Sequence, residues 1–119
     1  MASLNSVSII GNVGKEPEMR FTPSGKPVTS FNVVCNSKFG ETESTEWFNI
    51  VTWNKLAETC NQYITKGQQV FVEGRLQTRS WEGQDGEKKY RTEVIANRVL
   101  FLGQRKQDET TEETGEDLF

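Results

Sequence analysis

The sequence predicts an all-β domain of five strands with one helix between the third and fourth strands, followed by a disordered acidic tail. Three observations lead to this prediction. Short segments with alternating apolar side chains recur over residues 1–104, as expected of strands with one buried face. Helical spacing is found only over residues 55–66. Residues 105–119 have no apolar periodicity, which is typical of a disordered segment. A chain of 119 residues has room for one such domain with a modest core.

The first two strands are expected over residues 3–13 and 28–37, where apolar and polar side chains alternate. The segment 14–27 between them contains three prolines and Ser24-Gly25, which predicts a turn-rich loop. Arg20 and Phe21 form a basic and aromatic pair within this loop. Residues 38–45 are expected to form a polar hairpin loop around Gly40.

The third strand, residues 46–53, carries an unusual pattern. Side chains alternate between the two faces of a strand, so Trp47, Asn49 and Trp53 share one face. Phe48, Ile50 and Thr52 lie on the other face and fill the core. A domain of this size has one core, so the tryptophan face is left for a subunit contact or for a ligand.

The remaining elements are one helix and two long strands. Asn54 is expected to be the N-cap of a helix over residues 55–66 that ends at Gly67. The fourth strand, residues 69–81, has an apolar face formed by Val70, Val72, Gly74 and Leu76. A turn-rich tip over residues 82–89 leads to the last strand, residues 90–103.

Composition excludes several classes of function. The chain contains no histidine, which removes the usual general base and the commonest metal ligand. Cys35 and Cys60 lie 25 residues apart without a second pair, so they are expected to be buried free thiols. The glycines of residues 11–15 lack the spacing of a phosphate-binding loop. No apolar run approaches the roughly 20 residues of a membrane span, and no export signal is present. We therefore expect a cytoplasmic protein that is not an enzyme and needs no metal or cofactor.

The charge is divided unevenly along the chain. Residues 1–106 contain all 14 Lys and Arg and 11 Asp and Glu, for a net charge of +3. Residues 107–119 contain the other 6 acids and no base, for a net charge of −6. A basic body with an acidic tail is compatible with a nucleic-acid partner.

Five strands with a helix between the third and fourth form the connectivity of the OB-fold, a Greek-key barrel. This fold holds oligonucleotides on the face of strands 2 and 3 and in the loops that join strands 1–2 and 4–5. Single strands are bound by aromatic side chains that stack on bases and by cations that follow the phosphates. The candidates for stacking are Phe39, Trp47, Trp53 and Trp81. The candidates for phosphate or polar contacts are Arg20, Lys38, Asn49, Lys55, Arg75, Arg79, Lys88 and Lys89.

Over residues 3–104 the chain resembles the bacterial single-stranded DNA-binding proteins of the OB-fold type. The resemblance is carried by NSVSIIGNVGKEPEMRFTPSGKPV, by EWFNIVTWNKLAETCNQYITKGQQVFVEGRLQTRSWEGQDGEKKYRTEV and by the terminal GEDLF. It implies sequence-independent binding of single strands in replication, recombination and repair, association with the nucleoid, and a homotetramer. It also implies that Trp47, Trp53 and Trp81 stack on bases.

The sequence departs from the family pattern at several positions. Phe39 stands where some relatives have Trp. Phe48 stands where relatives often have His at a subunit contact, which makes it a candidate for the subunit interface. Arg75 and Gln77 reverse the order of basic and neutral side chains that is common in the family.

The acidic tail is short and lacks the Pro that usually precedes the final Phe. Its tip is expected to recruit genome-maintenance proteins, because a Phe ring beside a free carboxylate offers a partner an apolar and a charged anchor. The tip residues are Gly115, Glu116, Asp117, Leu118 and Phe119.

Two other functions remain open on the sequence alone. One is a primosome-type or phage-type paralogue of the same fold. The other is an OB-fold adaptor in which the tryptophan face binds a protein, and this adaptor would show no fluorescence quenching by oligo(dT).

Overall fold

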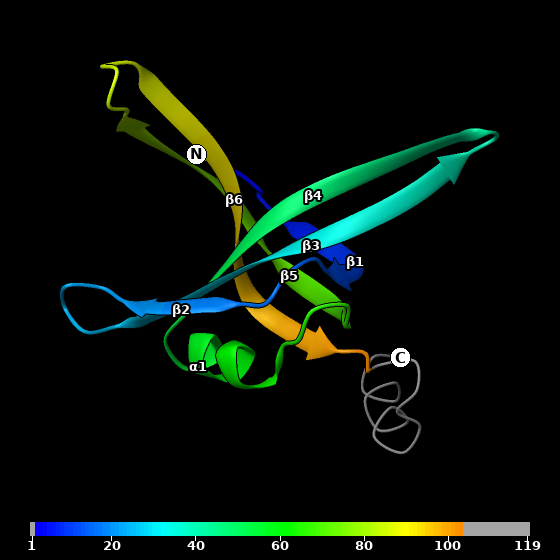
Figure 1. Ribbon diagram of the computed structural model, residues 1–119, viewed down its shortest axis with the longest axis horizontal. Coiled ribbons are helices and arrows are strands. Elements are labelled where there is room, and N and C mark those ends of the chain that lie inside the picture. The colour runs from blue at the N-terminus through cyan, green and yellow to red at the C-terminus, as the bar shows by residue number, and fades with distance from the viewer. Residues whose placement is uncertain (1, 104–119) are drawn as a thin grey trace.

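The computed structural model describes residues 2–103, which form a closed β-barrel with one helix (Figure 1). The elements are β1 (Val7–Val13), β2 (Glu18–Phe21), β3 (Pro27–Phe39), β4 (Thr42–Trp53), α1 (Asn54–Tyr63), β5 (Gln69–Glu82) and β6 (Lys88–Phe101). The strands are ordered β1-β5-β6-β4-β3-β2, and an additional pairing of β1 with β3 closes the barrel. All neighbours are antiparallel except β4 and β6, which run parallel. The predicted all-β barrel of OB-fold type is confirmed.

Two glycines allow the barrel to close. Gly11 is the last residue of β1 that pairs with β5 alone, because the pairing with β3 begins at Asn12. A Cβ atom at Gly11 would collide with the Val34 carbonyl oxygen and would lie 2.7 Å from Cγ1 of Val33. A Cβ atom at Gly74 would collide with the Ile95 carbonyl oxygen, at the register shift between β5 and β6. Both positions therefore require glycine for close strand approach.

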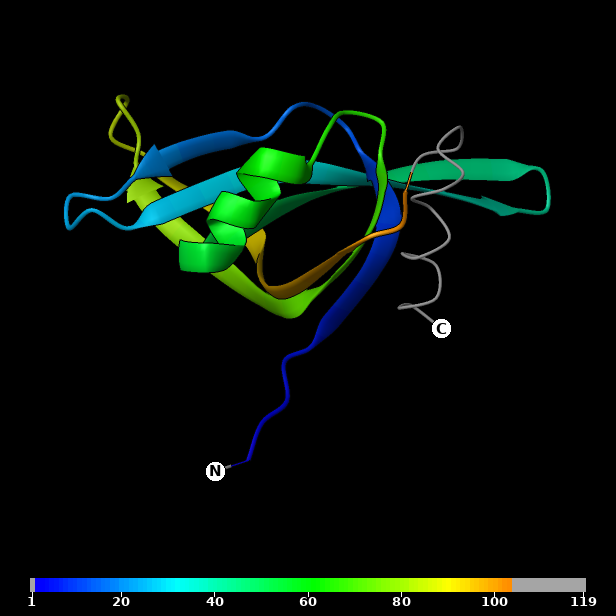
Figure 2. The same cartoon turned by 90° about the horizontal axis from the view of Figure 1, so that it is seen from below.

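The core lies inside the barrel and beneath the helix. Val33, Ile50, Val70 and Val72 are fully buried. Helix α1 lies across one end of the barrel and buries Ala57 and Cys60 (Figure 2). Two buried threonines tie the helix to the sheet. The Thr29 hydroxyl donates to the Ala57 carbonyl at 2.7 Å, and the Thr52 hydroxyl donates to the Thr29 carbonyl at 2.9 Å.

Two segments predicted to be loops are strands instead. Residues 18–21 form β2, which pairs with β3 from Glu18↔Ser30 to Phe21↔Pro27. Residues 38–45 contain only a two-residue turn at Gly40-Glu41, because β3 and β4 continue to Phe39↔Thr42. Polar side chains bridge this extension, as in the 2.8 Å hydrogen bond from the Thr45 hydroxyl to Asn36 Oδ1. Both segments are polar and show no apolar alternation, so the sequence does not predict these strands, which are held by backbone pairing.

Other predicted boundaries also differ. β1 begins at Val7 and not at residue 3, because the Asn5 side chain bonds both the N–H and the carbonyl of Leu76. The predicted Asn54 N-cap is wrong, since no side chain caps α1 and Asn54 has a positive φ of 59°. The helix ends at Tyr63, three residues earlier than predicted. Leu76 lies beyond the core and is exposed. No helix in residues 2–103 is long and apolar enough to cross a bilayer.

Candidate nucleic-acid interface

The candidate interface lies on the outer face of the sheet, where two hairpins separate. β4 and β6 pair only at Ile50↔Val94 and Val51↔Ile95. Beyond these pairs the β3–β4 and β5–β6 hairpins extend away from the barrel in different directions (Figure 1). The outward side chains of both hairpins therefore surround the opening between them.

A groove of about 510 Å³ lies beside this opening, over β3 and β4 and between β2 and the β5–β6 hairpin. Its floor is formed by small and neutral side chains of β3 and β4, including Ser30, Asn32, Asn49 and Val51. β2 contributes Glu18 and Arg20 on one side. The other side is formed by residues of β5 and β6, namely Gln77, Arg79, Arg91, Glu93 and Ile95. The face predicted for strands 2 and 3 thus forms the floor of a groove that spans five strands.

The predicted alternation of residues 46–53 is correct. Ile50 and Thr52 are buried, whereas Trp47 is 60% exposed and Trp53 is 41% exposed. Trp53 lines the groove. Trp47 stands on the same face of β4, one row beyond Asn49, opposite Val34 on β3. Two aromatic side chains are therefore presented on one face of β4, Trp53 in the groove and Trp47 outside its lining.

Trp81 belongs to the other hairpin. It lies near the end of β5, on the same face as Gln77 and Arg79, and is 43% exposed. The Arg79 guanidinium carbon lies 5.6 Å from the centroid of the Trp81 ring, within the range of a cation–π contact. The third tryptophan is thus oriented by a cation of the groove wall.

Phe39 lies farther from the groove. It is 87% exposed at the end of β3. The register with β4 is continuous, so Phe39 points to the opposite face of the hairpin from Trp47, while Lys38 shares the Trp47 face. Lys38 is placed opposite Glu43.

The predicted cations fall into two groups. Arg20 and Arg79 line the groove, whereas Lys38, Lys55, Arg75, Lys88 and Lys89 do not. Lys55 is exposed in the first turn of α1. Arg75 donates to Gln77 Oε1 at 3.3 Å. Lys89 pairs with Trp81 across the hairpin and forms an ion pair with Asp85 at 3.8 Å, while Lys88 points to the other face.

Sequence reasoning missed many of the polar residues of the groove, among them Lys15, Gln77, Arg91 and Glu93. Arg91 is paired with Arg79, and Glu93 is paired with Gln77, across β5 and β6. Alternation in the last strand would have placed Arg91 and Glu93 on one face. That this face of β6 lines the groove is seen only from the register of β6 with β5.

The chemistry of this surface suits binding. Its exposed aromatic rings can stack on bases, and its guanidinium groups can contact phosphates. Within residues 2–103, no group of three His, Cys, Asp or Glu side chains is arranged to hold a metal ion.

The two cysteines lie away from the groove and are free thiols in the structure. Cys60 is fully buried, as expected, and Cys35 is partly buried. Burial raises the pKa of the Cys60 thiol to about 12, although a hydrogen bond with Thr52 opposes this shift. Burial, with a smaller contribution from Glu46, also raises the pKa of Cys35. Neither thiol is activated as a nucleophile.

The remaining predicted residues are Phe48 and the five tip residues. Phe48 is partly buried and packs against the core cluster. The predicted tip, residues 115–119, lies outside the described residues.

Comparison with known proteins identifies the family. Residues 4–102 match the model of the single-strand binding protein family. The chain belongs to this family. The resemblance inferred from the sequence is thereby confirmed, and the family is a non-catalytic one, in agreement with the expectation that the chain is not an enzyme.

Individual members of the family show the extent of the similarity. "Single-stranded DNA-binding protein 1" of Chlorobaculum tepidum is 46% identical over 106 residues, which are 84% of this chain and 65% of that protein. The single-stranded DNA-binding protein of Neisseria meningitidis is 39% identical over 111 residues, 89% of this chain and 64% of that protein. This chain therefore spans slightly less than two thirds of these two relatives. "Single-stranded DNA-binding protein 2" of C. tepidum is 40% identical over 121 residues, with coverages of 97% and 82%.

A solved structure shares the fold. The chain titled "Plasmodium falciparum SSB complex with ssDNA" superposes with a TM-score of 0.80 at 30% identity. The match covers 87% of this chain and 98% of that chain.

Proposed function

We propose that this chain binds single-stranded DNA without sequence preference. The observation that carries the proposal is the groove over β3 and β4, which Trp53 lines together with Arg20, Arg79 and Arg91, while Trp47 and Trp81 are exposed on the strands beside it. Stacking on indole rings is tolerant of base identity, because every base has a π-face. Membership of the single-strand binding protein family supports the same function.

We assign the contacts by position. Trp47, Trp53 and Trp81 stack on bases, and Phe39 offers a further stacking surface at the tip of the β3–β4 hairpin, on the face opposite to Trp47. Asn49 contacts bases or sugars from the groove floor. The phosphates contact the cations that line the groove, Arg20 and Arg79, and the exposed cations outside it, Lys38, Lys55, Arg75, Lys88 and Lys89.

A titration of intrinsic tryptophan fluorescence with oligo(dT) at two salt concentrations tests this function. We expect strong quenching and an affinity that falls as salt rises, because phosphate binding releases counterions. The same result with oligo(dC) indicates binding without a sequence code. An unquenched spectrum at low salt would exclude the proposal and favour a protein-binding role for the tryptophan face.

We also propose that the chain assembles as a homotetramer. Ile10 and Leu76 are large apolar side chains exposed on the single barrel, and Phe48 and Phe71 are only partly covered. This apolar surface supports contact with further copies, with Phe48 at the subunit interface. Sedimentation velocity at micromolar concentration is expected to give a tetramer of the 13.5 kDa chain. A monomer under these conditions would contradict the assembly.

The cellular role that we propose is protection of single strands during replication, recombination and repair, in the cytoplasm at the nucleoid. The tail recruits partner enzymes, since its large apolar residues, Leu118 and Phe119, follow an acidic segment that steers them toward a basic partner surface. Removal of Leu118 and Phe119 is expected to abolish capture of a partner nuclease or helicase and to leave oligo(dT) affinity unchanged at moderate salt. Unaltered capture by the truncated chain would rule out docking through these residues.

A further inference from the structure

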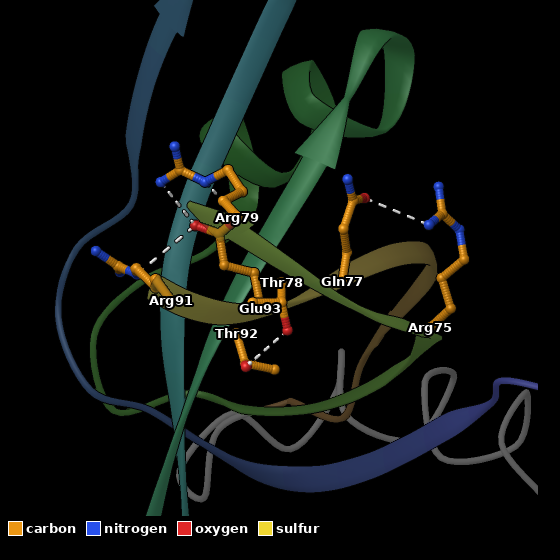
Figure 3. A network of polar contacts seen from close by, with 7 residues as sticks. All are labelled: Arg75, Gln77, Thr78, Arg79, Arg91, Thr92 and Glu93. Carbon is orange, nitrogen blue, oxygen red and sulfur yellow. Dashed lines mark hydrogen bonds and ion pairs between the residues drawn. The ribbon is translucent and has the colours of Figure 1, made fainter. Parts of the chain in front are cut away.

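A carboxylate lies in the wall of the groove proposed to hold a polyanion. Glu93 is 6% exposed and lies between two guanidinium groups, those of Arg79 and Arg91 (Figure 3). A single buried carboxylate would repel phosphates, but two cations against one anion leave this cluster with a net charge of +1. The question is which of the two arginines supplies that charge to DNA.

The Arg79 guanidinium contacts two groups, the Glu93 carboxylate and the Trp81 ring. Its Nε donates to Glu93 Oε1 at 3.1 Å, and its Nη2 donates to Glu93 Oε2 at 3.2 Å. This is the bidentate arrangement in which a guanidinium is most firmly oriented. The same guanidinium lies 5.6 Å from the centroid of the Trp81 ring. Glu93 thus fixes Arg79, and Arg79 in turn contacts the indole.

Arg91 is held loosely. Its Nε lies 3.6 Å from Glu93 Oε2, beyond hydrogen-bond distance. The two side chains are similarly exposed, 47% for Arg91 and 50% for Arg79, so the difference between them lies in their contacts with Glu93. Over residues 2–103, the Arg91 guanidinium donates no hydrogen bond, so its N–H groups are available to a phosphate.

The two arginines also differ in what their release would cost. If Arg79 turned to a phosphate, Glu93 would lose its bidentate partner while remaining almost fully buried, which is strongly unfavourable. If Arg91 turned to a phosphate, Glu93 would keep both hydrogen bonds from Arg79.

We propose that Glu93 is a positioning residue that gives the two arginines different roles. It locks Arg79 against Trp81, which prepares the indole for base stacking, and it leaves Arg91 as the phosphate-binding cation of this wall. The inference rests on the proposed binding of single-stranded DNA and refines the role of Arg79 within it.

The first measurement is the salt dependence of binding to fluorescein-labelled oligo(dT) by the full chain. Each phosphate contact adds about 0.7 to the magnitude of the log–log slope for single strands. Arg91→Gln is expected to flatten the slope by about 0.7. Glu93→Gln keeps the shape of the side chain but removes its charge, so it frees Arg79 and is expected to steepen the slope by about 0.7. Glu93→Asp, which keeps the charge, is expected to leave the slope close to that of the unaltered chain.

The second measurement is a double-mutant cycle between Arg79→Gln and Trp81→Ala. We expect a coupling of about two- to fivefold in Kd, the factor that corresponds to an exposed cation–π contact. The coupling is expected to disappear in the Glu93→Gln background. The matched cycle between Arg91→Gln and Trp81→Ala is expected to be additive.

These outcomes separate the inference from the function on which it rests. Failure of the unaltered chain to bind oligo(dT) would overturn the function itself. If the unaltered chain binds, an unchanged slope for Arg91→Gln overturns the division of roles, as does an Arg79–Trp81 coupling that survives Glu93→Gln. Thermal melting checks that each variant is folded. If Glu93→Gln does not fold, the salt slope of Arg91→Gln and the two mutant cycles in the unaltered background still test the proposed roles of Arg79 and Arg91.

Discussion

The Cζ3 edge of the Trp47 indole packs against Gly14, just after the end of β1. A Cβ atom on Gly14 would lie 2.8 Å from Cζ3 of Trp47 and 2.5 Å from Oδ1 of Asn32. Gly14 does not have a positive φ, so the requirement for glycine here comes from this close approach and not from backbone conformation. The loop after β1 therefore supports one edge of the indole that is proposed to stack on a base.

Gly14→Ala is expected to displace the Trp47 ring and to weaken oligo(dT) binding by about 1 kcal/mol, part of the 1–3 kcal/mol that a stacked base contributes. Binding is measured by anisotropy of a labelled oligonucleotide. The control is the same substitution in a Trp47→Ala background, where it is expected to have little further effect on Kd. An equal loss in both backgrounds would show that Gly14 acts independently of Trp47.

The three tryptophans are expected to contribute separately to binding. Trp47→Ala, Trp53→Ala and Trp81→Ala are each expected to weaken oligo(dT) binding by about 1–3 kcal/mol, because each removes one stacking surface. All three side chains are substantially exposed, so the melting temperature is expected to change little. Full affinity in all three folded variants would remove the stacking surface from the proposed function.

The main strands and the exposed face of residues 46–53 were predictable from the sequence. Burial of one face of a strand makes its apolar side chains alternate with polar ones. Ile50 and Thr52 must be inside one small core, which forces Trp47 and Trp53 outward. β2 was not predictable in this way. Its EMRF segment has one partly buried side chain and is held by backbone pairing to β3, which leaves no apolar pattern.

The Glu93 cluster was beyond sequence reasoning for a different reason. Arg79 and Glu93 are 14 residues apart and meet only through the register of β5 with β6. The register is continuous from Glu82↔Lys88 to Gly74↔Ala96, so it depends on where the turn begins, which the alternation of either strand alone does not reveal. Pairing between strands, and not the pattern within one strand, determines which charges meet.

The buried Cys60 thiol predicts a pH dependence of stability. Burial raises its pKa from 9.0 to about 12, and the opposing hydrogen bond with Thr52 is the weaker effect. Between these values the folded protein retains a proton that the unfolded chain releases, so the folded state binds more protons. The free energy of unfolding is therefore expected to fall as pH rises from 9 toward 12, by about 1.4 kcal/mol per pH unit for this one group.

Urea denaturation across this pH range measures the effect. Cys60→Ala serves as the control, since it lowers stability by a constant amount and leaves the other alkaline groups in place. The difference between the two proteins is expected to shrink with rising pH. A constant difference up to pH 12 would mean that the thiol does not contribute this pH dependence.

Arg20 is expected to make one of the phosphate contacts. It lies on β2 at the side of the groove, is exposed, and forms no side-chain hydrogen bond or ion pair within residues 2–103. Arg20→Gln is expected to weaken binding to oligo(dT) and oligo(dC) equally and to flatten the log–log salt slope by about 0.7. The matched control is Arg98→Gln. Arg98 pairs with Glu73 at 3.4 Å and lies over Phe71, outside the groove, so its loss is expected to leave the slope unchanged. If Arg20→Gln changed the preference between the two oligonucleotides and not the slope, Arg20 would contact a base and the phosphate path would run elsewhere.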